Sequence, residues 1–517
     1  MNLGSTAASA RRVLRPVARA VYRLGRAVAR SIYRLVRGAV RAVFAFAGRL
    51  SSAETRPRWM NRLPGNRFAL AGLVVLALVA LYGVATFARP AASAPRRGTT
   101  VPVTSADAAC PDTHGARVSA VTPPGAHGVG QASVTGRPVV LTSPGTAWST
   151  DVKGKDAGPW AFGAYGSLAP GLTVEQTTSE GGLAGTRCLQ PAADLWFAGP
   201  GPADAKDVGL YLTNVDDRPV TAIVAALSPE GSIETPEGED DVLVAPHTTR
   251  LVQVGVQVEG FGRTAADARL IALHIHADNG RIAAAVRVQR KKGADWLPAT
   301  VPGSSVVVPG VPSGSGKRRL LIAVPGRDEA QVRVQGIAKD GAFAPIGTRS
   351  LQAPALAVTS FDVGLGGKYA GLRLVSDKPV VAALVIEEGD DFAVTGATPP
   401  LTAEGQGGLV ADVRDKTTLL LTAPGAAAGV RLTQLMGQGP AGTPQDVRVP
   451  AGRTIEVKMP PPAGGDGYGL TIVPGRGSGP VYAARVLRIK KQGVTLLPVT
   501  PARMTALLPV VRDMPLP

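Results

Sequence analysis

The chain has 517 residues and a formal net charge of +18, with 45% hydrophobic and 18% charged residues. This composition excludes a disordered polyelectrolyte, and the length allows about three or four folded domains. Two cysteines and five histidines exclude a disulfide-dense scaffold, a four-cysteine zinc site and a histidine-rich metal protein. The 63 glycines and 44 prolines favour turn-rich β structure.

The positive charge is concentrated at the N-terminus. Residues 1–67 contain fifteen arginines, no lysine and a single acid, Glu54. Arginines recur there at every third or fourth position, which places them on one face of a helix with aliphatic side chains on the opposite face. These arginines are Arg11, Arg15, Arg19, Arg23, Arg26, Arg30, Arg34, Arg37 and Arg41.

We predict that this amphipathic helix lies on the cytoplasmic face of a lipid bilayer, with its arginines on anionic lipid head groups of the inner leaflet. Binding to nucleic acid or to an acidic groove of a partner protein are the alternatives for this segment. The rest of the chain is close to neutral, so we expect no nucleic-acid partner for the protein.

Residues 68–88 form an uncharged apolar run. As a helix the run spans about 31 Å, which matches the thickness of a bilayer core. A cleavable signal peptide is the alternative, but Pro95 directly follows the small residues Ala92 and Ala94 and disfavours cleavage. We predict an uncleaved, single-pass signal anchor with a cytoplasmic N-terminus and an extracellular C-terminal region.

Residues 89–109 follow the anchor and read as an extended linker. Both cysteines, Cys110 and Cys188, lie beyond it, in the part of the chain predicted to be exported. An oxidising compartment favours a disulfide between them. Such a bridge closes a loop of about 79 residues and contributes about 4–4.5 kcal/mol on the chain-entropy model.

From about residue 117 to 501 the apolar residues alternate or form runs of four to eight, interrupted by glycine and proline. This pattern predicts strands, with helices scarce. Representative predicted strands are 210–213, 242–245, 250–256, 270–276 and 282–289.

Short phrases recur at intervals of about 100 residues. Pro-Gly ends apolar segments at residues 200–201, 325–326 and 424–425, and Ala-Ala pairs begin at residues 283, 382 and 483. The period suits tandem immunoglobulin-like β-sandwich modules, whereas a β-propeller, the alternative, needs a period of about 40–50 residues. The predicted divisions are a disulfide-tied unit at 110–193, modules at 194–302, 303–401 and 406–502, and a tail at 503–517.

Residues 312–317, with the sequence PSGSGK, are interpreted as a hinge. The longer segment Gly310–Arg318 resembles a phosphate-binding loop only superficially, because the glycine spacing is wrong and Arg318 follows Lys317 where a hydroxyl residue is needed. No other nucleotide-binding or hydrolase motif is found. We therefore predict no catalytic residues and no cofactor.

Two patterns could bind a metal ion. His274 and His276 alternate along a predicted strand and share a face, with Leu273 and Ile275 on the inward face, but no third ligand is evident. Two acidic runs could hold calcium, although solvated turns explain them better, and we predict no metal site. The runs are Glu237, Glu239, Asp240, Asp241 and Glu387, Glu388, Asp390, Asp391.

Tryptophans could stack on sugar rings. In a core dominated by valine and alanine, however, such scarce aromatic residues more often anchor the packing. The four concerned are Trp148, Trp160, Trp196 and Trp296.

Several segments resemble an actinobacterial family of unknown function. They are Gly166–Val174, the segment 186–197 that contains Cys188 and Trp196, the Asp295-Trp296-Leu297-Pro298 box, and Cys110-Pro111 after the anchor. The resemblance covers about residues 68–502. It implies a single-pass membrane anchor, a β-rich exported region, the cysteine pair and a place in the cell envelope, and it implies no catalytic residue.

These features together predict a structural or interaction protein of the envelope that binds other envelope proteins or glycans. The alternative is a glycan-acting envelope enzyme whose paired carboxylates come from separate loops.

Overall fold

The structure of the protein is a computed structural model. It describes Ala77 and residues 99–508 except 136, 140, 142, 236–239, 257–264, 347–349, 404–406, 462–466 and 491. The chain divides into two compact units, Met1–Arg96 and Arg97–Pro517. The predicted arginine helix lies outside the described residues, as does the predicted anchor at 68–88 apart from Ala77, which is helical. In the described part of the chain, no helix has the length and apolar character needed to cross a membrane.

The described part of the second unit is mainly β, as predicted, and consists of four repeats and one additional strand pair. Repeat 1 contains β2 (Ser105–Cys110), β3 (Ala116–Val121), β4 (Gly130–Val134), β5 (Arg137–Pro138), β6 (Ala147–Asp151), the 3-10 helix η2 (Gly154–Asp156), β7 (Trp160–Gly166), β8 (Thr173–Thr178) and β9 (Ala184–Arg187). Repeat 2 contains β10 (Asp194–Pro200), the 3-10 helix η3 (Pro202–Asp204), β11 (Asp207–Thr213), β12 (Val220–Ser228), β13 (Gly231–Ile233), β14 (Asp241–Val244), β15 (Thr249–Gln253), β16 (Leu270–Ala277), β17 (Ala283–Gln289) and β18 (Ala294–Leu297).

Repeats 3 and 4 continue the same series. Repeat 3 contains β19 (Gly303–Val311), β20 (Arg318–Ala323), β21 (Ala330–Ala338), β22 (Gly341–Phe343), β23 (Leu351–Ala353), β24 (Val358–Asp362), the long β25 (Ala370–Glu388) and β26 (Asp391–Gly396). Repeat 4 contains β27 (Gly408–Val413), β28 (Thr417–Ala423), β29 (Ala428–Leu435), β30 (Gln445–Val449), β31 (Arg453–Lys458), β32 (Tyr468–Pro474), β33 (Tyr482–Ile489) and β34 (Gly493–Val499).

All four repeats have the same antiparallel topology. Repeat 1 has one sheet in the order β2-β7-β4-β5 and a second in the order β6-β3-β8-β9. Repeats 2 and 4 reproduce both orders, and in repeat 3 the single strand β25 serves both sheets. The extra strands β14 and β23 pair with the equivalent strands β12 and β21. The sheets therefore exchange strands along the chain, unlike propeller blades, which are built from consecutive strands.

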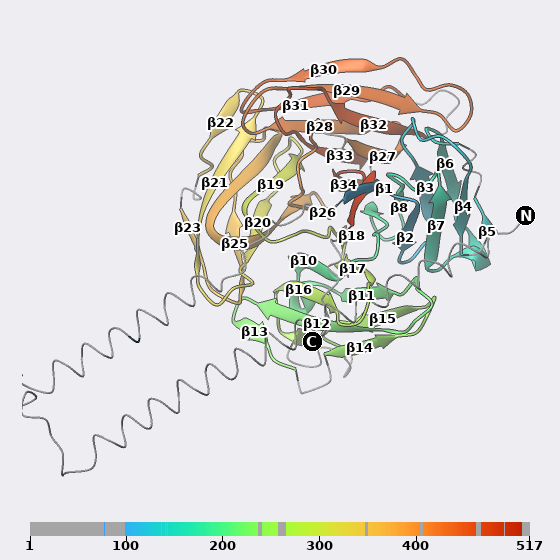
Figure 1. Ribbon diagram of the computed structural model, residues 1–517. Coiled ribbons are helices and arrows are strands. Elements are labelled where there is room, and N and C mark those ends of the chain that lie inside the picture. The colour runs from blue at the N-terminus through green and yellow to red at the C-terminus, as the bar shows by residue number, and fades with distance from the viewer. Residues whose placement is uncertain are drawn as a thin grey trace, which may run out of the picture. The chain divides into compact units, whose positions relative to one another are not determined.

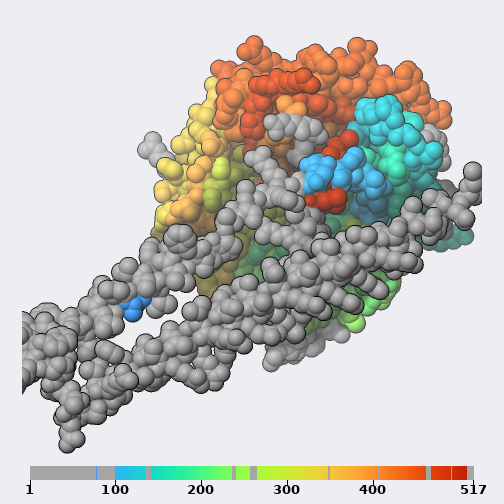
Figure 2. All heavy atoms as spheres, viewed as in Figure 1, coloured from blue at the N-terminus to red at the C-terminus, as the bar shows by residue number. Residues whose placement is uncertain are grey.

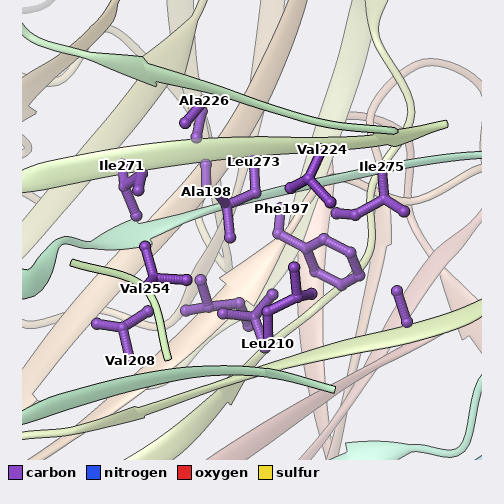
Figure 3. Packing of buried hydrophobic residues seen from close by; sticks show 14 of the residues in the cluster. Phe197, Ala198, Val208, Leu210, Val224, Ala226, Val254, Ile271, Leu273 and Ile275 are labelled. Atoms are coloured by element: carbon purple, nitrogen blue, oxygen red, sulfur yellow. The ribbon is translucent and has the colours of Figure 1, made fainter. Parts of the chain in front are cut away.

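The two sheets of a repeat pack against each other. Figure 3 shows this for repeat 2, where Phe197, Val224 and Leu273 of one sheet face Val208 and Leu210 of the other. The strand bounds agree with the predicted strands to within three residues at each end. Burial of alternate aliphatic side chains between two sheets drives this packing.

Continuous apolar runs mark strands that are buried on both faces. In β20, Leu320 and Ile322 belong to the core of repeat 3, whereas Leu321 and Ala323 belong to a cluster that is continuous with the core of repeat 2. By contrast, β21 alternates buried and exposed positions because one of its faces meets solvent. A strand with a continuous apolar run therefore has a neighbouring repeat against its outer face, whereas a strand with alternating residues has solvent there.

The repeats follow one another around a common centre (Figure 1). Strand β10 of repeat 2 contacts β20 and β25 of repeat 3, β19 of repeat 3 contacts β28 and β33 of repeat 4, and β27 of repeat 4 contacts β3 and β8 of repeat 1. The last strands of the repeats, β9, β18, β26 and β34, contact one another at the centre. The four repeats therefore form a closed ring.

A strand pair joins the chain segments that precede and follow the four repeats. β1 (Thr99–Pro102) pairs antiparallel with β35 (Thr505–Leu508), and Figure 2 shows them as adjacent blue and red surfaces. These strands come from segments that the sequence predicts to be a linker and a tail. Each segment contributes backbone hydrogen bonds that hold the ends of the unit together.

The recurring phrases differ in how well they mark equivalent positions. The Ala-Ala pairs begin at Ala283, Ala382 and Ala483, which lie in β17, β25 and β33 and pair with the second strand of each repeat. The Pro-Gly phrase at 200–201 ends the first strand of repeat 2, whereas the other two follow second strands. This difference in position explains why the three Pro-Gly phrases are unevenly spaced in the sequence. The segment 312–317 connects β19 to β20 within repeat 3 and is not a hinge between repeats.

Candidate axial ligand site

A buried carboxyl group links all four repeats at the centre of the ring. Asp295 of β18 is fully buried. It accepts hydrogen bonds from the backbone N–H of Gly185 in repeat 1 (3.2 Å), from that of Val394 in repeat 3 (2.8 Å) and from the hydroxyl of Thr495 in repeat 4 (3.2 Å). Burial raises the pKa of Asp295 well above its ordinary value, and the backbone donors oppose the shift.

A second carboxyl group lies beside it among glycines. Asp391 accepts a hydrogen bond from the backbone N–H of Val494 (3.0 Å), and burial raises its pKa to about 6. Gly182, Gly293 and Gly493, one from each of the other repeats, surround it with positive φ angles. A Cβ at Gly293 or Gly493 would clash with the Asp391 carboxylate, so the three glycines leave room for one side chain. We call Asp295, Asp391 and these glycines the axial hub.

Next to the hub, the segment that follows the last strand of each repeat pairs with the first strand of the same repeat. Each repeat has one such isolated antiparallel bridge: Ala109 with Leu189, Trp196 with Thr300, Val307 with Thr398, and Gly408 with Pro501. The four returning segments surround a cavity of about 400 Å³, which we call the axial cavity. Each repeat therefore contributes to its wall.

The wall of the axial cavity is mainly apolar. Leu189, Trp296, Ala397, Leu496 and Leu497 contribute apolar surface from the four repeats. Polar side chains at the wall are Thr186, Arg187, Gln190, Asp194, Thr300, Thr398, Thr500 and Arg503. An apolar concavity with a few convergent polar groups is the usual form of a small-ligand site.

Arg187 is the central cation of the wall. Its Nη1 donates to the carbonyl oxygen of Thr500 (3.3 Å) and to the Thr500 hydroxyl, and its Nη2 donates to the Thr173 hydroxyl (3.1 Å). Burial lowers the pKa of Arg187 to about 10; nearby Glu175 opposes this shift and Arg503 adds to it. The guanidinium therefore remains charged at neutral pH, beside a second cation.

A histidine cluster lies at Asp194. Asp194 Oδ1 is 3.1 Å from His274 Nε2 and 3.0 Å from His276 Nδ1, and the His274 ring stacks on Trp196 at 4.3 Å. The hydrogen bond with His276, and then that with His274, lowers the pKa of Asp194. Leu273 and Ile275 are fully buried on the opposite face, as the alternation predicts. Asp194 is thus a third polar side chain beside the two histidines, and the sequence pattern did not reveal it. Among the described residues, however, no set of three or more His, Cys, Asp or Glu is arranged to hold a metal ion.

The second acidic run joins neighbouring repeats. Glu387 pairs with Arg290 (3.2 Å) and Asp390 with Lys292 (2.8 Å), both of repeat 2, while Glu388 pairs with Arg488 (2.8 Å) of repeat 4. Asp391 belongs to the axial hub. In the first run, Glu237 and Glu239 lie outside the described residues.

The tryptophans pack against the cores of their repeats. Trp148 and Trp160 contact the core of repeat 1, Trp196 contacts that of repeat 2, and Trp296 is 3% exposed. Their scarcity in the sequence is thus compatible with a packing role, and Trp296 also reaches the wall of the axial cavity.

The disulfide prediction is confirmed. Cys110 and Cys188 are bonded, with their Cα atoms 4.4 Å apart. Cys110 ends β2 in one sheet of repeat 1, and Cys188 directly follows β9 in the other sheet. The bond therefore ties the two sheets together beside the axial cavity.

Sequence reasoning missed the cavity residues Arg187 and Arg503. A signal for part of the site was present, because the segment containing Arg187 and the Asp295–Pro298 box both belong to the motifs that carry the family resemblance. What the sequence lacks is any indication that these motifs, more than 100 residues apart, meet at one point.

The chain was compared with known protein families, curated proteins and solved structures. No curated protein matches the chain, and no solved structure matches it. A family model described as a family of unknown function (DUF5719) matches residues 146–460, from the start of β6 in repeat 1 into repeat 4 and including most of the axial site. The match covers more than half of the chain, and the protein therefore belongs to the DUF5719 family of unknown function.

Proposed function

We propose that this protein is an exported protein of the cell envelope that acts by binding, with the axial cavity as its ligand site. The observation that carries the proposal is the cavity itself. It has a volume of about 400 Å³, a mainly apolar wall and a few polar groups that converge from four repeats. These are the properties of small-molecule sites, which have volumes of about 300–1,000 Å³.

The location forms part of the proposal. The apolar run at 68–88 is proposed as a single-pass membrane anchor, with the arginine helix on the inner leaflet of an actinobacterial cell membrane and the ring outside. The disulfide between Cys110 and Cys188 supports this placement, because such bonds persist in oxidising compartments.

The outer faces of the repeats are proposed as surfaces for envelope proteins or glycans. The exchange of strands between two packed sheets supports an immunoglobulin-like sandwich in each repeat, an architecture common among binding domains. Binding is preferred to glycan hydrolysis, which uses two carboxyl groups across a cleft. Within the described part of the cavity wall, Asp194 is the one acidic residue, and its carboxylate contacts two histidines.

Filling the cavity tests the proposal. Ala299 lines the cavity, and Ala299→Phe would occupy part of its volume. We expect the full-length protein, extracted from its membrane, to carry a bound small molecule in native mass spectrometry and the variant to lose it. Exposed Ala342 on β22 provides a matched control as Ala342→Phe. The same bound mass in the Ala299→Phe variant would reject the cavity as the ligand site.

Location is tested in intact cells. A protease-sensitive tag after Pro517 should be cleaved by an external protease, and a tag before Met1 should be protected. Protection of the C-terminal tag would contradict export.

A further inference from the structure

The axial cavity carries an excess of positive charge. Arg187 of β9 and Arg503, which follows β34, both line it, and the proximity of Arg503 contributes to the lowered pKa of Arg187. In the described part of the chain, neither guanidinium lies within ion-pair distance of a carboxylate. Two like charges at one cavity repel each other, so an anion that contacts both would stabilise the pair.

The nearest acids are already engaged. Glu175 Oε2 lies 3.2 Å from Arg485 Nη1, in the interface between repeats 1 and 4. Asp194 contacts His274 and His276. The cavity therefore presents two cations whose charge the surrounding carboxylates do not neutralise by direct contact.

The rest of the wall selects for an apolar body. Trp296, Leu496 and Leu497 are each no more than 3% exposed, and Leu189, Leu195 and Ala397 extend the same surface. A sugar ring with several hydroxyl groups would leave many of them unpaired against such a wall. An alkyl or other apolar group would gain about 25 cal/mol for each Å² of surface that it buries.

We propose that the axial cavity binds an anionic amphiphile, with its apolar body against the leucine and tryptophan wall and its carboxylate or phosphate between Arg187 and Arg503. This inference rests on the proposed function, because it names the ligand class of the same cavity. Arg187 is held in place by Thr500 and Thr173, so it is preorganised for the anion. Arg503 is exposed and would close on the bound anion from the other side.

The test uses the full-length protein in phosphatidylcholine nanodiscs and four probes: decyl phosphate, decanoate, decanol and inorganic phosphate. Binding is followed by tryptophan fluorescence, since Trp296 lines the cavity, and by calorimetry. Ala299→Phe, with the cavity filled, measures how much of each probe partitions into the lipid. We expect decyl phosphate and decanoate to bind at least tenfold more tightly than decanol, a difference of about 1.4 kcal/mol or more.

Arg503→Gln separates charge recognition from folding, because Arg503 is exposed. It should weaken both anionic probes about tenfold and leave decanol unchanged. Arg333→Gln, on an exposed position of β21 outside the cavity, should have no effect. Arg187→Lys keeps the charge, and should weaken binding less than Arg503→Gln.

The outcomes distinguish this inference from the proposed function. Equal binding of decanol and decyl phosphate, unaffected by Arg503→Gln, would retain the cavity as a ligand site and overturn the anionic ligand. Tight binding of inorganic phosphate would overturn the apolar body. If no probe binds to the unmodified protein beyond the Ala299→Phe baseline, the amphiphile proposal is rejected, while a copurified mass lost in Ala299→Phe would still support the proposed function.

Discussion

The same kind of junction is built from apolar side chains between repeats 2 and 3 and from buried charges between repeats 4 and 1. In both places the first strand of one repeat packs on the second sheet of the next. Between repeats 2 and 3, Leu321, Val381 and Phe392 join the core of repeat 2 in one continuous cluster. Between repeats 4 and 1, the apolar contribution is a small separate cluster around Leu409 and Val121.

Buried charges occupy the rest of the junction between repeats 4 and 1. Arg485 of β33 is 1% exposed and contacts Glu175 of repeat 1 (3.2 Å). Asp412 of β27 contacts Arg414 (2.7 Å) and lies 3.5 Å from Arg117 of repeat 1. Burial raises the pKa of Glu175, and the charge of Arg485 opposes that shift.

The ring is therefore closed by a specific junction. Apolar surfaces tolerate small displacements, whereas buried ions require one register, because any unpaired charge is costly. The junction between repeats 4 and 1 is the one that chain connectivity does not provide, since the two repeats are far apart in sequence. Charge pairing there would select the correct partner for closure.

The largest expected effect comes from removing the central cation of this junction. Arg485→Met leaves Glu175 and Asp412 buried without their shared partner, which typically costs about 3–5 kcal/mol. We expect a loss of that size in the free energy of unfolding measured by urea denaturation. Adding Glu175→Gln should recover part of the loss. A loss below about 1 kcal/mol would show that the charges do not hold the ring closed.

A smaller loss is expected at the apolar junction. Leu321→Ala removes a fully buried side chain that faces repeat 2, and large-to-small changes of this kind cost about 2–5 kcal/mol. Neighbouring Leu320→Ala is the matched control, because it faces the core of repeat 3. Hydrogen exchange should increase in β10 and β16 for Leu321→Ala and in β21 for Leu320→Ala. Identical exchange patterns would mean that the two faces of β20 are not distinct.

The smallest effect concerns the axial hub, where all junctions meet. The pKa of Asp391 is about 6 in the folded protein, above the ordinary value, so the folded state binds more protons between about pH 4 and about pH 6. This group therefore makes stability fall as pH rises through that window. Asp391→Asn should make the decrease in unfolding free energy between these pH values smaller by about 1–2 kcal/mol. The expected change is no larger because the carboxyl group is only partly buried.

Thermal unfolding near pH 4 and near pH 7 checks this prediction. The difference in Tm between the two pH values should be smaller for Asp391→Asn than for the unmodified protein. Glu180→Gln, at an exposed carboxyl group of repeat 1, serves as the control. An unchanged difference would remove Asp391 from the pH response.

The sequence predicts local structure well in this protein and tertiary neighbours poorly. Strand alternation identifies the faces of β16 correctly, with Leu273 and Ile275 inward. The segment that forms β20 is recognised from its sequence as an apolar strand, but its pattern alone does not show that Leu321 contacts another repeat. Two cysteines in a chain predicted to be exported have one possible partner each, so the disulfide followed directly.

The axial site could not be read from the sequence for a physical reason. Gly293 and Gly493 look like ordinary turn residues, yet each is required because Asp391 occupies the space that a side chain would fill, and at Gly182 the backbone of Gly293 and Ala294 fills that space. Arg485 lies between apolar residues of β33, and charged side chains are seldom fully buried. Its burial depends on Glu175, more than 300 residues earlier, and local pattern contains no information about that distance.

The strand pair that joins the two ends of the ring also determines how the unit would respond to a pulling force. Thr99, where the chain enters β1, pairs with Leu508, where it leaves β35. Tension applied to the two chain ends beside this strand pair would therefore first break the pairing of Thr99 with Leu508. The remaining residue pairs would then separate one after another. On the N-terminal side the extension would next reach β2, whose Cys110 is covalently fixed to Cys188. Tension on the N-terminal side would thus release a short length of chain at low force before it reaches the disulfide bond.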